Sequence, residues 1–197
     1  MDFKNSETRL NLMKAFAGES QARNRYTFSA KKAKELGHDM LEKVFLFTAE
    51  QERAHAEVFY NHLKQLSGEN LSIEGTYPID IYDDLNQILK SSSHNEYEEY
   101  EHVYPGFAKT ARKEGFEKVA IDFEHIAGIE KVHGDRFNNL LTKVNSQGLY
   151  KDSSTQNWMC LNCGFIYEGM QVPNMCPVCS YDQGYFIRLS YAPYTSK

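Results

Sequence analysis

Apolar residues recur every three or four positions in four long stretches of this 197-residue chain, which is the spacing of one face of an α-helix. The stretches span residues 12–30, 41–63, 85–107 and 116–144. A glycine separates the first two stretches (Gly37) and the last two (Gly115), and glycine often ends a helix because it accepts a left-handed conformation. We therefore predict two antiparallel helical hairpins.

The segment that joins the two hairpins, residues 67–81, contains Gly68, Gly75 and Pro78 and shows no helical period. It is long enough to cross the bundle, which would make the second and third helices parallel. Two hairpins joined by one long crossover form a ferritin-like four-helix bundle, so we predict a mainly α fold. Pro105 falls inside the third helix and should kink it, because proline removes a backbone donor.

The helical period stops near Lys151. Residues 152–156 are polar and are typical of a linker, and the remaining stretch contains short aromatic-rich segments and cysteine pairs. A piece of this size is too small to bury a sufficient core and needs a metal to fold. We predict a four-helix bundle domain over residues 1–150 and a small β-rich metal domain over residues 151–197.

The two halves of the bundle repeat one device, a lone glutamate followed on the next helix by Glu-x-x-His. The two glutamates are 33 residues apart in the first half and 34 apart in the second. Residues three apart on a helix are neighbours, so each Glu–His pair can reach one metal ion. All of these side chains fall within the apolar stripes, where a solvated helix face would not place them. The candidate ligands of this two-metal site are Glu19, Glu52, His55, Glu96, Glu130 and His133.

Glu99 breaks the internal repeat, because the first helix has Ala22 at the matching position. With Glu99 the site has five carboxylates, and burying five unpaired negative charges is prohibitive. Two divalent ions would supply +4 against these five charges and leave −1. Oxygen and nitrogen ligands without thiolate favour iron or manganese, whereas zinc could bind but has no redox chemistry.

Tyr26 and Tyr104 lie seven and eight residues after Glu19 and Glu96, about two turns along the same helix faces. One interpretation makes them core aromatics whose hydroxyls bond a ligand carboxylate. The other makes them proton donors to the substrate oxygen at the metal site. Both interpretations place the two phenols beside the metals.

Two Cys-x-x-Cys pairs near the end of the chain, Cys160 with Cys163 and Cys176 with Cys179, are separated by 12 residues. Such pairs make a tetrahedral four-thiolate metal site, and Gly164 permits the tight turn after the first pair. Spacing alone does not separate iron from zinc. The sequence around both pairs resembles rubredoxin, which holds one redox iron, so we expect iron, which zinc could replace. The aromatic residues expected to shield this centre from water are Trp158, Phe165, Tyr167 and Phe186.

Charge and hydropathy exclude several classes of partner. The net charge is −5 and no basic stripe is present, which argues against nucleic-acid binding. The first residues lack the apolar segment of a secretory signal, and no apolar run approaches the roughly 20 residues that span a bilayer. We therefore expect a cytoplasmic protein without a membrane partner, in which reduced cysteines bind a metal.

A carboxylate bundle followed by a short rubredoxin module resembles rubrerythrin, and the matching motifs lie in residues 15–26, 51–55, 96–100, 104–108 and 130–133. The resemblance implies that two irons are bound, with Glu52 and Glu130 bridging them. It also implies that one iron moves between Glu99, when oxidised, and His55, when reduced, which would explain why Glu99 breaks the repeat. The implied iron ligands are Glu19, Glu52, Glu96, Glu99, Glu130 and His133.

Rubrerythrins act as peroxidases, so the resemblance implies reduction of hydrogen peroxide to water and protection against oxidative stress. Electrons would pass through the four-cysteine iron from a separate reductase or rubredoxin, ultimately from NADH, because this chain has no dinucleotide-binding motif. The family also implies a homodimer in which the rubredoxin module of one subunit faces the di-iron site of the other. The implied catalytic residues are Glu99, His55, Tyr26 and Tyr104.

Three alternatives remain open. A ferroxidase or iron-handling protein of the ferritin type would explain the bundle, but storage needs no electron input and therefore no four-cysteine module. A pure electron carrier would explain the module, but not the intact ligands on four helices. Reduction of O₂ in place of peroxide is the third alternative, and it uses the same residues.

Overall fold

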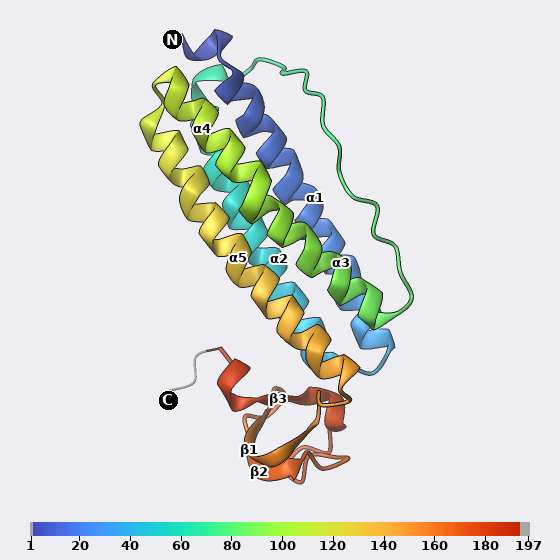
Figure 1. The fold of residues 1–197 in the computed structure, drawn as a ribbon. Coiled ribbons are helices and arrows are strands. Elements are labelled where there is room, and N and C mark those ends of the chain that lie inside the picture. The colour runs from blue at the N-terminus through green and yellow to red at the C-terminus, as the bar shows by residue number, and fades with distance from the viewer. Residues whose placement is uncertain (1, 194–197) are drawn as a thin grey trace.

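The computed structural model describes residues 2–193 and contains a long helical bundle with a small sheet at one end (Figure 1). Two helices form the first hairpin, and α3 and α4 together pair with α5 in the second (Figure 1). Residues 67–84 run along the outside of the bundle, so α2 and α3 are parallel (Figure 1). The predicted ferritin-like bundle with a long crossover is confirmed. The helices are α1 (Glu7–Glu35), α2 (Asp39–His62), α3 (Leu85–Glu98), α4 (Tyr104–Glu114) and α5 (Glu117–Asn145).

The helix ends follow local sequence signals. The Ser6 hydroxyl accepts a hydrogen bond from a backbone N–H of the first turn of α1, and the Asp84 carboxylate caps α3 in the same way. Gly37 and Gly115 have φ angles of 78° and 89°, which allow the tight turns inside the two hairpins. None of the described helices combines the length and apolar character needed to cross a bilayer.

A five-residue π-helical segment, Glu99–Val103, joins α3 to α4. The backbone N–H of Tyr104 donates to the carbonyl oxygen of Glu99, five residues earlier. A π turn inserts one extra residue without ending the helix. Pro105 lies in the first turn of α4, directly after the π segment, and the kink predicted there stays a prediction.

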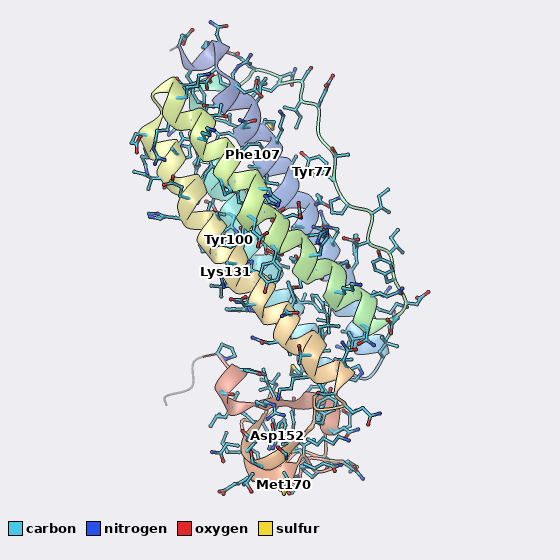
Figure 2. The ribbon with its side chains drawn as sticks, viewed as in Figure 1. Tyr77, Tyr100, Phe107, Lys131, Asp152 and Met170 are labelled. Carbon is cyan, nitrogen blue, oxygen red and sulfur yellow. The ribbon has the colours of Figure 1, made fainter. Side chains whose placement is uncertain are left out.

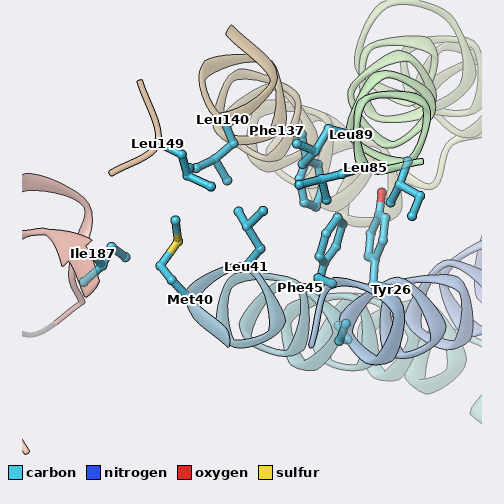
Figure 3. Close-up of a cluster of buried hydrophobic side chains, with 14 of the residues drawn as sticks. Tyr26, Met40, Leu41, Phe45, Leu85, Leu89, Phe137, Leu140, Leu149 and Ile187 are labelled. Carbon is cyan, nitrogen blue, oxygen red and sulfur yellow. The ribbon is translucent and has the colours of Figure 1, made fainter. Parts of the chain in front are cut away.

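Two apolar clusters fill the bundle, one toward each end. The cluster nearer the sheet contains Tyr26, Phe45 and Phe137, whose rings contact one another (Figure 3). The other contains Phe59 and Phe123, whose ring centroids are 5.0 Å apart. Along every long helix the candidate metal ligands separate members of the two clusters. The carboxylate site is therefore a polar layer closed above and below by apolar packing.

Within the described residues that follow α5, three strands form an antiparallel sheet in the order β2–β1–β3. Its strands are β1 (Lys151–Cys160), β2 (Ile166–Gln171) and β3 (Phe186–Arg188). The interpretation of residues 152–156 as a linker was wrong, because they belong to β1. Their polar composition reflects exposure rather than lack of structure, and Asp152 is held by Arg188 at 2.6 Å.

The sheet packs directly on the end of the bundle. Ile187 of β3 belongs to the same apolar cluster as Met40 of α2 (Figure 3). Gly184 approaches the α1–α2 turn so closely that a Cβ there would lie 2.3 Å from the carbonyl oxygen of Gly37. The domain boundary predicted at residue 150 falls between α5 and β1, and it stays a prediction.

Candidate metal centres

Two overlapping groups of acidic and imidazole side chains lie inside the bundle. One consists of Glu19, Glu52, His55 and Glu130, and the other of Glu52, Glu96, Glu130 and His133. Within each group one ligand atom from every residue lies within 4.8 Å of the others. Glu52 and Glu130 belong to both groups, which is the arrangement that two carboxylate bridges between two ions require. The structure thus brings together every candidate ligand except Glu99.

Many of the atoms in these groups are buried and have no hydrogen-bond partner among the described residues. His133 Nδ1 lies 2.9 Å from both Glu52 Oε1 and Glu130 Oε2, yet none of the three atoms is satisfied by a hydrogen bond. Buried polar atoms are normally hydrogen-bonded. Nitrogen and oxygen atoms that lie this close together without forming hydrogen bonds indicate that they converge on a common metal-binding position. The donor set fits two hard or borderline metal ions. The unsatisfied atoms are Glu19 Oε2, Glu52 Oε1, Glu96 Oε2, Glu130 Oε1 and Oε2, and His133 Nδ1.

The electrostatics of the cluster favour added positive charge. Burial and then the charge of Glu130 raise the pKa of Glu19 well above its usual range. Burial alone would lower the pKa of His133, but the carboxylates of Glu130 and Glu52 raise it to about 12. Both shifts arise because an excess of buried negative charge attracts protons, and two cations would relieve the same excess.

The phenols of Tyr26 and Tyr104 hold carboxylates across the site. Tyr26 of α1 donates a hydrogen bond to Glu96 Oε1 on α3, and Tyr104 donates to Glu19 Oε1 on α1. Tyr104 follows Glu96 by one residue more than Tyr26 follows Glu19. The π segment takes up that extra residue, so both phenols face the cluster. These contacts agree with the core-aromatic interpretation, and proton delivery by the phenols stays a prediction.

His55 and Glu99 occupy different positions relative to the cluster. His55 Nδ1 lies 3.1 Å from Glu52 Oε2 and 3.0 Å from Glu130 Oε1. Burial would lower the pKa of His55, but these two carboxylates raise it to about 9. Glu99, at the start of the π segment, belongs to neither group of ligand atoms. His55 thus belongs to the converging cluster and Glu99 does not, and the switch between them stays a prediction.

Three residues that no motif predicted orient the His133 imidazole. Its Nε2 lies 3.1 Å from Gln51 Oε1, and Arg136 donates to the same oxygen at 3.0 Å and to Thr48 Oγ1 at 2.7 Å. With Nδ1 directed at a metal ion, Nε2 would carry the proton and donate a hydrogen bond to Gln51 Oε1. Two sequence signals could have found them, since Gln51 directly precedes Glu52 and Arg136 follows His133 by three residues.

The four cysteines converge at the edge of the sheet. Cys160 Sγ lies 3.7 Å from Cys179 Sγ, and Cys163 Sγ lies 3.7 Å from Cys176 Sγ. Metal–sulfur bonds of about 2.3 Å give a tetrahedron with edges of about 3.8 Å, so the spacing fits one tetrahedral metal ion. The four predicted aromatic residues pack in the same cluster as Cys160, Cys176 and Cys179.

Both turns that follow the cysteine pairs present backbone N–H groups to sulfur. The N–H of Tyr181 lowers the pKa of Cys179 to about 6, whereas burial raises the pKa of Cys160 to about 12. Gly164 follows the first pair with a φ of 77°, and Ser180 follows the second with a φ of 60°. The second turn therefore keeps the left-handed conformation of the first without a glycine.

Family models and relatives match both parts of the chain. The Rubrerythrin model matches residues 11–141, and the model for the rubredoxin-like domain of rubrerythrin matches residues 158–187. Rubrerythrin-1 of Clostridium acetobutylicum is 43% identical over 189 residues, which cover 95% of this chain and 96% of that protein. Rubrerythrin of Porphyromonas gingivalis is 39% identical over 93% of this chain and 90% of its own length.

Solved structures with the same fold support the match. A mixed-valence state of nigerythrin aligns with a TM-score of 0.62 at 25% identity, over 93% of this chain and 90% of that chain. Bacterioferritin of Desulfovibrio desulfuricans, whose structure describes a di-iron site in different catalytic states, aligns with a TM-score of 0.64 at 25% identity. The second alignment covers 72% of this chain and 82% of that protein.

Proposed function

This chain belongs to the rubrerythrin family, and on that premise we propose that it reduces hydrogen peroxide to water with electrons delivered through its own four-cysteine centre. The chain carries the di-iron carboxylate site and the four-cysteine rubredoxin-like site of that family. The observation that supports the proposal most is the presence of both centres in one chain. The carboxylate groups offer a two-ion site for the reaction, and the thiolates offer a route for electrons.

The proposed reaction needs two electrons and two protons for each peroxide. When bound, the two iron ions supply one electron each. We assign the ligand roles to the two interleaved groups of side chains, with Glu52 and Glu130 shared between the ions. His55 and Glu99 are then alternative ligands of one ion, as the family resemblance implies.

The protein groups around the site are suited to hold protons. Burial and the charge of Glu19 raise the pKa of Tyr104 well above its usual range, so this phenol keeps its proton and donates a hydrogen bond to Glu19 Oε1. Burial, together with the charge of Glu96, likewise raises the pKa of Glu99. Tyr104 and Glu99 both lie on the α3–α4 side of the cluster, where the π segment begins, and we assign proton delivery to this side of the site.

Electron delivery is proposed to occur between subunits of a homodimer. The sheet is fixed at the end of its own bundle, where Ile187 packs with Met40. Glu52 lies about three helical turns beyond Met40 along α2, so a stretch of bundle separates the two centres of one chain. A second chain packed in the opposite direction would bring the cysteine site of one chain near the carboxylate site of the other.

A mixing experiment tests the dimer. Cys163→Ser should disable the cysteine centre, and Glu130→Ala should disable the carboxylate centre. In a mixed dimer of these two inactive variants, the intact cysteine centre and the intact carboxylate centre lie on different subunits. Peroxide turnover by that pair therefore requires electron transfer between subunits. Recovery of peroxide turnover after co-refolding supports the proposal, and no recovery in verified mixed dimers contradicts it.

The activity itself is tested by single-turnover oxidation. The iron-loaded protein is reduced without oxygen and mixed with one equivalent of hydrogen peroxide, and the thiolate-to-iron colour is followed by stopped flow. Rapid return of colour, with one peroxide consumed for every two electrons, is the expected result. A colourless cysteine site would indicate zinc and would contradict electron delivery through it.

A ferroxidase or O₂-reducing function is the second candidate, because the bundle also aligns with bacterioferritin. The same experiment separates the candidates. Reoxidation by air that is much faster than reoxidation by peroxide would favour the second, as would large assemblies on a sizing column. The four-cysteine site argues for the first, since iron storage needs no electron input.

A further inference from the structure

A cavity of about 600 Å³ lies between the crossover segment, residues 67–84, and the helices that carry the carboxylate site. Ala15 and Gly18 of α1 line one wall. Glu99 and Tyr104 line the opposite wall, and Glu99 is the only candidate metal ligand in the lining within residues 2–193. Tyr104 also donates a hydrogen bond to Glu19, so the cavity wall includes a direct neighbour of the carboxylate cluster.

The side chain of Tyr77 lies between the crossover segment and α1 (Figure 2). Its hydroxyl donates a hydrogen bond to the carbonyl oxygen of Lys14 at 3.0 Å. Its ring covers Gly18, where a Cβ would lie 3.7 Å from Tyr77 Cε1. Gly75 gives the ring room on the other side, because a Cβ there would lie 3.0 Å from the Tyr77 hydroxyl oxygen. Tyr77 is thus held over the cavity by two glycines and one hydrogen bond.

The crossover segment is attached to the bundle mainly through side chains. Asp80 pairs with Arg25 of α1 at 2.9 Å and accepts a hydrogen bond from Asn95 of α3 at 2.7 Å. In contrast, residues 70–83 form no backbone-to-backbone hydrogen bond with any described residue. Exposed segments without such bonds open at a low free-energy cost. Tyr77 can therefore move away while Asp80 keeps the segment in place and the helices stay folded.

We propose that this cavity is the entry route of small ligands to the carboxylate site and that Tyr77 is its gate. One water-sized molecule occupies about 30 Å³, so the cavity admits a molecule of the size of peroxide once the phenol moves. Such a molecule would meet Glu99 and Tyr104 before any other residue of the site. The identity of the ligand as peroxide rests on the proposed function, whereas the route does not.

Azide binding tests the gate without peroxide chemistry. The full-length iron-loaded protein is oxidised and mixed with azide, and the difference spectrum of the carboxylate site is followed by stopped flow. The four-thiolate site has no free coordination position, so its colour cancels in the difference. The variants are Tyr77→Ala, which removes the gate, and Gly18→Leu, which fills the space beneath it. Tyr82→Ala makes the same change elsewhere in the crossover segment, outside the cavity lining, and serves as the matched control.

Tyr77→Ala should raise the association and dissociation rate constants of azide by the same factor, because a gate changes rates and leaves affinity unchanged. If the open form is populated about a tenth of the time, the factor is on the order of ten. Gly18→Leu should slow association, and Tyr82→Ala should match the unmodified protein. Unchanged rates in both cavity variants would overturn the route. Unequal changes in the two rate constants of Tyr77→Ala would overturn the gate and indicate a structural role for Tyr77.

This outcome is independent of the proposed activity. A protein that binds azide through the gate but does not reduce peroxide would leave the route standing and contradict the proposed function. A protein that reduces peroxide while azide binds at the same rate in all variants would support the proposed function and contradict the route.

Discussion

The phenol of Tyr26 on α1 donates a hydrogen bond to the carboxylate of Glu96 on α3, so a residue of the first hairpin holds a candidate ligand of the second. Tyr104 makes the reciprocal contact with Glu19. Each hairpin therefore supplies a candidate ligand and also a tyrosine hydroxyl that holds a candidate ligand of the other hairpin. The carboxylate site is complete only when the two hairpins are docked.

Tyr26→Phe should lower the free energy of unfolding by about 1–3 kcal/mol, because it leaves a buried acceptor of Glu96 without its donor. Urea unfolding of the iron-loaded protein measures the change. Tyr60→Phe is the control, since Tyr60 is 56% exposed and its variant should unfold at the concentration of the unmodified protein. Equal midpoints for all three proteins would show that the Tyr26 hydroxyl contributes nothing.

Glu99→Ala should keep both irons of the carboxylate site, because Glu99 belongs to neither group of converging ligand atoms. Peroxide turnover should fall by roughly tenfold to a hundredfold if Glu99 becomes a ligand during the cycle. Iron analysis and steady-state peroxide consumption measure the two effects. Glu101→Ala, an exposed change in the same π segment, is the control. Unchanged turnover would refute the switch and assign Glu99 a structural role.

Gln51→Leu should weaken metal binding at the carboxylate site by about tenfold to a hundredfold, because it removes the acceptor that orients His133. Competition with a chelator, followed by iron release, measures the loss. The exposed Gln65→Leu change provides the comparison. Release at the same rate from both variants would mean that Arg136 and the carboxylates orient the imidazole without Gln51.

Removal of the metal from the cysteine site should unfold the sheet and leave the bundle helical, because so small a unit lacks a sufficient core of its own. Trp158 is the single tryptophan of the chain and is fully buried against the cysteines. Its fluorescence should shift to longer wavelength on metal removal, while the far-ultraviolet circular dichroism changes little. A buried tryptophan signal in the metal-free protein would show that packing on the bundle alone holds the sheet.

The contribution of Glu114 to the stability of the bundle should decrease as the pH falls. Its carboxylate accepts hydrogen bonds from the backbone N–H groups of Glu7 and Thr8 at 3.0 and 2.8 Å, at the start of α1. Burial opposes ionisation, but these bonds and the Thr8 hydroxyl outweigh it and lower the pKa of Glu114. Stability from a lowered pKa is present above the unfolded value of 4.5 and is lost as the pH falls through the lower folded value.

Glu114→Gln should therefore be less stable than the unmodified protein at neutral pH, by about 1 kcal/mol. The difference should shrink as the pH drops below about 4.5. Urea unfolding of both proteins across this range measures it, and contributions from other carboxylates cancel in the comparison. A difference that is constant with pH would mean that the hydrogen bonds do not depend on the charge.

The helices and the six converging side chains of the carboxylate cluster could be predicted because both follow from one local pattern. A helical period locates each stripe, and Glu52 or His133 inside a stripe is a buried polar residue that needs a partner. The π segment could not be predicted in the same way. The sequence carries two traces of it, Pro105 and the one-residue difference between the Glu19–Tyr26 and Glu96–Tyr104 spacings, and neither specifies a π turn on its own.

Strand β1 was missed for a different reason. Its first residues are polar, and their pairing with β2 and the contact of Asp152 with Arg188 are non-local. The contact of Tyr77 with α1 is also non-local, since it joins residues 63 positions apart. Local composition carries no information about such pairs, so the gate and the first strand appear only in the folded chain.

The close approach of Gly184 to the carbonyl of Gly37 holds the sheet against the α1–α2 turn. Residues 152–156 form part of a strand, so they do not act as a flexible tether for the cysteine centre. The sheet that carries the four cysteines is packed on the end of the bundle, so its orientation relative to the helices is set when the chain folds. Any partner that exchanges electrons with the cysteine centre must therefore fit a surface of fixed shape. Complementarity to that surface, and not movement of the sheet, would decide which partners can bind.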